Sequence, residues 1–253
     1  MGPVFTCSID DGHPLDARTA ELLDKHGLHG TFYLPIRNCE GDSVMAAPAM
    51  RELAQRFEIG SHTRDHCYLK NVDAWQAYEQ IADGKRQLED VLGEEVAGFC
   101  YPGGRYRRRD VELVRSCGFL YARTTMNLCF DAGMLPFEMP TTIQFYPHGR
   151  SVYLRNFVAS RSRLHRIGGL QLALAQEDWV ARLYAMFDHA CARNSVFHLW
   201  AHSLQIETLG AWDTLDAFLS HVAANVPVHH RLTNGELARR SFVVPQTSAV
   251  ELF

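Results

Sequence analysis

The sequence predicts an α/β protein whose largely parallel sheet is distorted or closed into a (β/α) barrel. Short apolar runs alternate with amphipathic stretches along most of the chain, and repeated strand–helix units favour parallel strands covered by helices. The 253 residues are 47% hydrophobic and 21% charged, which is ordinary for a globular protein with a large core. No linker, repeat or low-complexity tract divides the chain. We therefore predict one domain over residues 1–253, with a tail of uncertain structure at 241–253.

The first half of the chain shows the strand–helix alternation clearly. Residues 4–9 read as a buried strand that ends in a turn cluster at 10–14. Asp16 is expected to cap the next helix, and Gly27 is its stop signal. Further strands are predicted at 30–35, 58–60, 97–101 and 119–124, and further helices at 47–57, 73–92 and 110–117.

The second half is less regular. Residues 127–169 are rich in Pro, Met and aromatic residues, with strand-like pieces at 141–146 and 151–156. A helix around 179–187, a strand at 195–201 and a helix at 212–222 follow. We predict a last strand at 226–232 and a short final helix capped by Thr233.

Charge and cysteine content exclude several classes of protein. The formal net charge of −4 argues against a dedicated nucleic-acid binder. The basic cluster of Arg105, Arg107, Arg108 and Arg109 reads as a solvated loop beside a site, with contact to an anionic substrate group as the sharper alternative. No leader pattern or apolar run of membrane-spanning length is present, and seven scattered cysteines without a Cys-x-x-Cys pair are typical of reduced thiols. We expect a cytoplasmic location without stable membrane insertion.

Polar residues collect after the predicted strands, where barrel enzymes carry their catalytic groups. These strand-end segments are Asp10-Asp11, His62 to His66, Cys100 to Arg105, Arg123 to Thr125, and His202-Ser203. They are far apart in sequence and are expected to share one rim.

Two of these segments suggest a metal site. His62 and His66 are four residues apart, which places both imidazoles on one face of a helical turn. Alone, this spacing more often marks two unrelated surface histidines. A carboxylate from Asp10 or Asp11 would complete a facial ligand set, and the second carboxylate would then act on water.

These motifs resemble those of polysaccharide deacetylases, the NodB-homology or family-four carbohydrate esterases. Ser8-Ile9-Asp10-Asp11-Gly12 is similar to their Thr-Phe-Asp-Asp-Gly signature, and His62-Thr63-Arg64-Asp65-His66 to their His-Ser/Thr-x-x-His motif. Phe99 to Gly104 resembles their third motif, and Phe197 to Ser203 resembles the late strand with their catalytic histidine. The resemblance runs over nearly the whole chain and implies a distorted NodB-type barrel.

The resemblance implies a role for each matching residue. Asp11, His62 and His66 would bind the metal, Asp10 would be the general base and His202 the general acid. The backbone N–H of Gly103 would contact the oxyanion, although the family usually has an aromatic residue there. His198 is the alternative acid, with a role in the core or behind the site preferred.

Substrate contacts are expected from residues around the same rim, where aromatic rings suit a sugar face. They are Tyr101, Pro102, Arg105, Tyr106, Arg123 and Trp200, with Tyr68 as a further ring. For Trp200 the plainer interpretation is a place in the barrel core.

The chain departs from the family pattern at two points. Cys100 stands where the family has an arginine that orients the base, and Arg105 or Arg123 could reach that place from a neighbouring strand end. The stretch from Arg123 to Asn127 lacks the family's acid that tunes the catalytic histidine, and Glu207 is a candidate substitute. Cys100 itself reads as a buried, inert thiol.

We therefore expect a metal-dependent hydrolase that removes an N-acyl, typically N-acetyl, group from a sugar or glycan precursor. One divalent ion is implied, Zn²⁺ first, with Co²⁺, Ni²⁺, Mn²⁺ or Fe²⁺ as alternatives. The other candidates are a hydrolase of a small amide, ureide or imide on the same scaffold, and a catalytically silent sugar-binding homologue. The expected partner is an N-acetylated sugar rather than a nucleic acid, and a homo-oligomer stays open.

Overall fold

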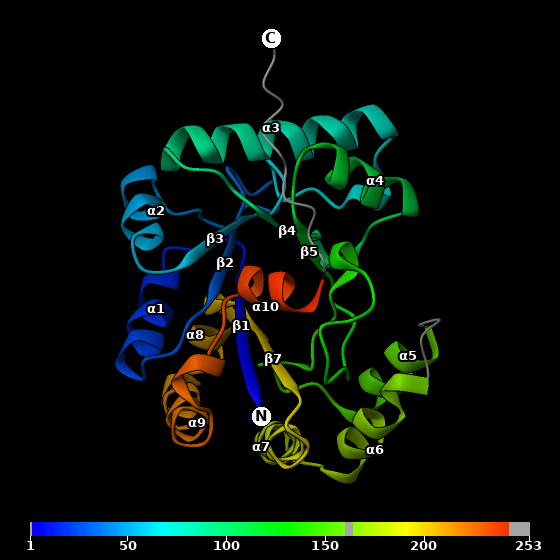
Figure 1. Cartoon of the computed structure of the whole chain (residues 1–253). Coiled ribbons are helices and arrows are strands. Elements are labelled where there is room, and N and C mark those ends of the chain that lie inside the picture. The colour runs from blue at the N-terminus through cyan, green and yellow to red at the C-terminus, as the bar shows by residue number, and fades with distance from the viewer. Residues whose placement is uncertain (1, 160–163, 243–253) are drawn as a thin grey trace.

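The computed structural model describes residues 2–159 and 164–242. In this part of the chain, seven strands form one sheet in the order β5-β4-β3-β2-β1-β7-β6, and every neighbouring pair is parallel. The sheet is curled into a half-barrel (Figure 1), so the predicted distorted (β/α) barrel is confirmed. The strands are β1 (Val4–Asp10), β2 (Thr31–Leu34), β3 (Glu58–Ser61), β4 (Gly98–Cys100), β5 (Tyr121–Arg123), β6 (Ile143–Gln144) and β7 (Val196–Ala201).

Helices surround this sheet (Figure 1), as parallel strands require, because each crossover returns the chain over a sheet face. In the described residues they are α1 (Asp16–Lys25), α2 (Ala47–Ala54), α3 (Ala74–Leu92), α4 (Arg108–Ser116), α5 (Arg150–Ala159), α6 (Ile167–Ala175), α7 (Trp179–Arg193), α8 (Ser203–Thr208), α9 (Trp212–Asn225) and α10 (Asn234–Ser241). Short 3-10 turns are η1 (Leu69–Asn71), η2 (Pro102–Gly104), η3 (Pro136–Glu138), η4 (Leu164–Arg166) and η5 (Val228–His230). Among the described residues, no helix is both long and apolar enough to cross a membrane.

Strand β1 lies in the interior of the sheet, between β2 and β7. Its register pairs Asp10 with Tyr33 of β2 and Ile9 with Ala201 of β7. Because side chains alternate along a strand, Phe5, Cys7 and Ile9 face one side and join the main apolar core. Asp10 faces the other side, into the curl of the half-barrel, together with the other even-numbered residues of β1.

The edges β5 and β6 do not pair with each other. The irregular segment 124–142 bridges them, with Thr124 N–H bonded to Met139 O at 2.9 Å and Leu128 N–H to Thr142 O at 2.9 Å. Helix α10 lies across the interior of the curl in Figure 1 and closes its amino-terminal end. Its first residues bond to the starts of two strands, Asn234 N–H to Thr31 Oγ1 at 2.9 Å and Gly235 N–H to a Glu58 carboxylate oxygen at 2.9 Å.

Most of the predicted elements are present, with ends shifted by a few residues. The predicted strands at 4–9, 30–35, 58–60, 97–101, 119–124 and 195–201 correspond to β1, β2, β3, β4, β5 and β7. Thr233 caps α10 as predicted, with its hydroxyl accepting from Glu236 N–H. The piece at 141–146 contains the two-residue β6. Of the tail at 241–253, all but the first two residues lie outside the described residues.

Four local predictions were wrong. Residues 151–156 are helical in α5, because an apolar run this short does not distinguish strand from helix. The strand predicted at 226–232 is instead the turn η5 with one bridge between Arg231 and Phe5. Its Pro227 lacks an N–H for pairing, and Val228 is exposed rather than inward-facing.

The other two wrong predictions are the helix cap at Asp16 and the helical turn at His62. The N-cap of α1 is Leu15, and Asp16 lies in the first turn with a fully buried carboxyl whose pKa burial raises well above its usual range. His62 and His66 lie in an irregular loop after β3, in which Thr63 and His66 have φ of 64° and 53°. The loop conformation is stabilised by Thr63 Oγ1, which accepts from Cys67 N–H at 2.8 Å.

Candidate active site

The ends of β1 and β3 bring one carboxylate and two imidazoles together. Asp11 Oδ1 lies 3.1 Å from His66 Nε2 and 3.5 Å from His62 Nε2. One ligand atom from each of the three residues lies within 4.8 Å of the others, so they form a candidate cation site. The predicted trio of Asp11, His62 and His66 therefore converges on one point.

The backbone at this point is held in an uncommon conformation. Asp11 has a φ of 81°, and His66 has a φ of 53°, both in the left-handed region that costs free energy for residues other than glycine. The turn after β1 is tied down by Gly12 O, which accepts from Met45 N–H at 2.8 Å. Because such strain persists only where the surroundings impose it, the fold itself aims these two side chains at each other.

The electrostatics suit a cation. Burial alone would raise the pKa of Asp11, but the adjacent His62 and His66 imidazoles hold its pKa well below its usual range. Burial opposes protonation of His66, yet the Asp11 and Glu40 carboxylates outweigh it and raise the pKa of His66. Asp11 Oδ1 is buried without a hydrogen bond of good geometry among the described residues. A divalent ion would satisfy that oxygen and both imidazoles, so the residues fit a metal with one Asp and two His ligands.

Each imidazole is also held from behind. His62 Nδ1 lies 2.8 Å from Cys100 O at the end of β4, which makes it the donor when Nε2 faces a metal. His66 Nδ1 lies 3.1 Å from a Glu40 carboxylate oxygen, close enough for electrostatic attraction but without the geometry of a hydrogen bond. Glu40 comes from the loop after β2, and its other oxygen accepts from Tyr68 Oη at 2.7 Å. No strand-end or spacing rule singled out Glu40 in the sequence.

Asp10, the predicted base, is buried directly beside this cluster and is 3% exposed. Its Oδ2 accepts from Trp200 Nε1 at 2.6 Å and lies 3.5 Å from Cys100 Sγ, whereas Oδ1 has no hydrogen-bond partner among the described residues. Burial raises the pKa of Asp10. A carboxylate with one oxygen held and one free, and with raised basicity, can take a proton from a water.

Trp200 makes a contact in the candidate site that the sequence did not predict. It lies on β7, half-buried, and donates to Asp10 instead of filling the core. Its ring also meets the His202 ring edge-on at 5.1 Å. It thus connects the predicted base to the predicted acid, although it was expected only as a substrate contact or a core residue.

His202 follows β7 and faces the cluster from the opposite side to His62. Its Nε2 lies 3.6 Å from Asp11 Oδ2, and its Nδ1 lies 3.2 Å from Gln205 Oε1 and 3.3 Å from Gln144 Nε2. Two neutral amides thus occupy the position where a tuning carboxylate was sought. Glu207 does not supply it, because its carboxylate accepts from Trp212 Nε1 and pairs with Arg18 at 3.5 Å.

His198, the alternative acid, is not at the rim. It is fully buried inside the curl, with its two ring nitrogens 2.6 Å from Thr6 Oγ1 and 2.8 Å from Ser8 Oγ. Burial lowers its pKa well below the usual range, and the charge of Arg123 lowers it further. His198 therefore lies in the interior of the sheet rather than among the groups at the rim.

Gly103 lies in η2 at the mouth of the site with a φ of 55°. Its N–H donates none of the backbone hydrogen bonds found among the described residues, so it is free to meet an oxyanion. A Cβ at this position would lie 2.9 Å from a carbon of the Tyr68 ring. Tyr68 therefore fills the space beside Gly103 from the neighbouring loop.

The two candidate arginines lie in different surroundings. Arg105 is exposed, with its guanidinium carbon 4.7 Å from the centre of the Tyr68 ring. Arg123 is fully buried, paired in register with Cys100, and none of its three guanidinium nitrogens has a hydrogen-bond partner among the described residues. Burial lowers the pKa of Arg123, while the charge of Asp10 is among those that act to raise it. Neither arginine forms an ion pair with Asp10.

Of the expected substrate contacts, Tyr101 and Pro102 are buried and Tyr106 is half-buried. Tyr101 is fully buried and donates from its Oη to Phe137 O at 3.1 Å. Tyr106 stacks on Tyr101 at 4.1 Å and donates to Glu138 at 2.8 Å. Pro102 is buried at the start of η2. Cys100 is buried as predicted, and burial raises the pKa of its thiol well above the usual range.

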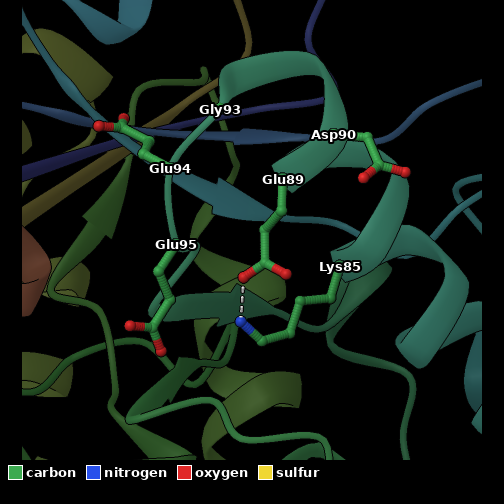
Figure 2. A pocket seen from close by; sticks show the side chains of 6 residues that line it. All are labelled: Lys85, Glu89, Asp90, Gly93, Glu94 and Glu95. Carbon is green, nitrogen blue, oxygen red and sulfur yellow. Dashed lines mark hydrogen bonds and ion pairs between the residues drawn. The ribbon is translucent and has the colours of Figure 1, made fainter.

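The chain also has a shallow hollow far from this cluster (Figure 2). It lies where α3 ends and the chain turns toward β4, at the opposite end of the strands from the metal cluster. Its lining is mostly acidic, and Lys85 pairs there with Glu89. The candidate chemistry lies entirely at the other end.

Comparison with known proteins points to one family. Residues 2–122 match the sequence model of polysaccharide deacetylases. Over this stretch the chain is similar to the polysaccharide deacetylase family. The matched residues include Asp10, Asp11, His62, His66 and Gly103, whereas Trp200 and His202 lie beyond them.

The curated relatives of the chain are distant. A candidate polysaccharide deacetylase of Bacillus subtilis is 26% identical over 120 residues, which are 47% of this chain and 43% of that protein. The peptidoglycan-N-acetylglucosamine deacetylase of Listeria monocytogenes is 31% identical over 91 residues, 34% of this chain and 18% of that protein. The chain thus spans less than half the length of these curated relatives.

A solved structure supports the fold over nearly the whole chain. A candidate polysaccharide deacetylase from Mycobacterium smegmatis superposes with a TM-score of 0.66 at 16% identity, over 95% of this chain and 91% of that one. The deacetylase fold therefore extends past residue 122 to include β6, β7 and the His202 segment.

Proposed function

We propose that this chain hydrolyses an N-acyl amide on a sugar, with one divalent metal ion. The observation that carries the proposal is the convergence of a metal-ligand trio, Asp11, His62 and His66, with a buried carboxylate and an imidazole on either side. The match of residues 2–122 to the polysaccharide deacetylase family supports the reaction class. A binding module would have no need of a second buried carboxylate with a free oxygen beside the cation.

Asp11, His62 and His66 would hold the ion, which when bound polarises the acyl carbonyl and makes water more acidic. Two imidazoles and one carboxylate suit Zn²⁺ best, and Co²⁺, Ni²⁺, Mn²⁺ and Fe²⁺ are also compatible with this ligand set.

Asp10 would accept the proton of the attacking water on its free Oδ1. Trp200 Nε1, at 2.6 Å from Oδ2, keeps the carboxylate oriented while the free Oδ1 accepts the proton. Because burial raises the pKa of Asp10, its proton affinity is closer to what a general base at neutral pH needs.

His202 would donate a proton to the departing amine from Nε2. Gln205 Oε1, 3.2 Å from Nδ1, can accept from that nitrogen when the ring is protonated. The Gly103 N–H would stabilise negative charge on the former carbonyl oxygen; one such donor is typically worth about 3 kcal/mol.

The substrate class rests on the relatives. One of them is named for deacetylation of peptidoglycan N-acetylglucosamine. We infer an N-acetylated sugar, and the seven free cysteines favour a cytoplasmic precursor rather than a finished wall polymer.

The test compares metal content and turnover in four proteins. Purified wild type, Asp10→Asn, His62→Ala and His202→Ala are analysed for bound metal and for acetate release from N-acetylglucosamine derivatives. Wild type should bind about one ion and release acetate. Asp10→Asn and His202→Ala should keep the metal and lose at least about 100-fold in kcat, because each removes a proton-transfer group. His62→Ala should lose the metal.

A wild type that binds no added Zn²⁺ or Co²⁺ would refute the mechanism. Metal binding without acetate release, but with turnover of a ureide or imide, would show that the protein hydrolyses a different class of amide. Sugar binding without any turnover would identify a silent homologue.

A further inference from the structure

The rim beside the metal cluster carries exposed cations without carboxylate partners. Arg105, Arg107, Arg108 and Lys70 are all exposed, and within the described part of the chain none of them forms an ion pair. By contrast, Arg109 next to them pairs with Asp110 at 3.0 Å. In a chain with a net charge of −4, such a cluster concentrates positive potential at one place.

The backbone holds these cations together. Lys70 N–H donates to Arg105 O at 2.9 Å, and Arg107 Nη2 donates to Lys70 O at 2.6 Å. The loop after the metal-binding histidines and the loop after η2 are therefore joined, and both start from strand ends that build the site.

Arg105 is fixed relative to the metal cluster by one aromatic ring. Its guanidinium stacks on Tyr68 at 4.7 Å, and the Tyr68 ring meets the His66 ring edge-on at 5.8 Å. The same Tyr68 ring covers Gly103, whose Cβ position lies 2.9 Å from it. The Tyr68 ring therefore lies between Arg105 and both His66, a proposed metal ligand, and Gly103, the proposed oxyanion donor.

The nearest carboxylate on this ring belongs to Glu40. One of its oxygens accepts from Tyr68 Oη at 2.7 Å, and the other lies 3.1 Å from His66 Nδ1. A guanidinium stacked on an aromatic face keeps its N–H donors at its edge, where they match a planar or tetrahedral oxyanion.

We propose that Arg105, seated on Tyr68, binds an anionic group of the substrate close to the acyl amide that is cleaved. This inference rests on the proposed function and narrows its substrate to a sugar with a phosphate or carboxylate. Lys70, Arg107 and Arg108 add attraction over a longer range. A neutral N-acetylglucosamine oligomer would leave this subsite unused.

The experiment compares three N-acetylglucosamine substrates on wild type and Arg105→Gln. They are the 1-phosphate, the uronic acid with a carboxylate at C6, and the neutral methyl glycoside. We expect wild type to favour one anionic substrate, and Arg105→Gln to lower kcat/KM for it at least about 10-fold, mainly through KM, since a charge-assisted bond is lost. Turnover of the methyl glycoside should change less than about twofold. Comparison of the 1-phosphate with the uronic acid decides whether the anionic group bound by Arg105 is a phosphate or a carboxylate.

Two matched variants serve as controls. Arg105→Lys keeps the charge and should recover part of the preference. Arg115→Gln removes an exposed arginine of α4 that pairs with Glu112 and should change nothing. Added salt should weaken wild-type turnover of the anionic substrate more than that of Arg105→Gln.

Binding gives a readout that does not depend on turnover. Calorimetry on metal-loaded Asp10→Asn, with and without Arg105→Gln, should show weaker binding of the preferred anionic sugar in the double variant. If Arg105→Gln affects all three substrates equally, or none, the anionic subsite is wrong while deacetylation stands. If wild type releases no acetate from any sugar, the proposed function fails, and the calorimetry alone decides whether Arg105 binds the anion.

Discussion

Both ring nitrogens of His66 face carboxylates. Nε2 faces Asp11 at 3.1 Å and Nδ1 faces Glu40 at 3.1 Å. A carboxylate behind a metal-binding imidazole fixes its tautomer and orientation and makes it a better ligand. Glu40 is exposed, so its contribution comes from geometry rather than from a buried charge.

Glu40→Gln should therefore weaken metal binding without abolishing it. We expect an increase in the Kd for Zn²⁺ of roughly 10-fold, within the range known for loss of such a partner. Competition with a chromophoric chelator measures it. Glu94→Gln, an exposed glutamate at the opposite end of the molecule, is the matched control. An unchanged Kd in Glu40→Gln would mean that Glu40 does not support His66.

Alternation along the strands gives the curl of the sheet a polar interior. Asp10 and Ser8 of β1, His198 of β7 and Arg123 of β5 all project into it. A fully buried guanidinium stays charged and is costly without a counter-charge. Asp10 is a carboxylate that acts on Arg123 electrostatically, although the two form no direct ion pair.

The interaction between Asp10 and Arg123 predicts the direction in which a substitution of Arg123 changes the stability of the fold. Arg123→Met should destabilise the metal-free wild type, because it leaves the Asp10 carboxylate without the nearby positive charge. In an Asp10→Asn background the same change removes an uncompensated cation and should cost less, or stabilise. Urea unfolding of the four proteins in chelator gives the coupling, which we expect to exceed about 1 kcal/mol. Additive effects would show that the two charges do not interact.

At the scale of the whole molecule, His198 couples folding to pH. Burial lowers its pKa well below the usual range in the folded protein. The unfolded chain binds this proton below about pH 6.5, whereas the folded chain does not. Since the unfolded state then holds more protons, stability falls as pH drops below about 6.5, by up to about 1.4 kcal/mol per pH unit from this group.

His198→Gln should remove that part of the pH dependence. Glutamine can still bond to Thr6 and Ser8, so the variant is expected to fold. Urea unfolding of metal-free protein between about pH 7 and pH 5 should show a shallower loss of stability than in wild type. The other histidines are common to both proteins and cancel in the difference. Parallel curves for the two proteins would mean that His198 is not held neutral.

The sequence by itself determined the strand–helix alternation and the strand-end residues of the site. Asp10, Asp11, His62 and His66 follow short apolar strands, and parallel strands must present their carboxyl ends at one edge. Local patterns therefore sufficed to predict the barrel and to place the candidate site at the strand ends, whereas the choice of Asp11, His62 and His66 as metal ligands came from the resemblance to a family. They failed at 226–232 and 151–156, where short apolar runs are ambiguous and neighbouring contacts decide.

Tertiary structure alone decided which side chains surround those groups. Glu40 behind His66, Trp200 on Asp10 and Tyr68 over Gly103 are contacts between segments 26 to 190 residues apart, with no periodicity to reveal them. The same holds for Gln144, which is 58 residues from His202 and contacts it beside the sequence neighbour Gln205, where Glu207 was expected. A sequence pattern records the side of an element on which a residue lies, but the distances across the curl depend on how the sheet closes.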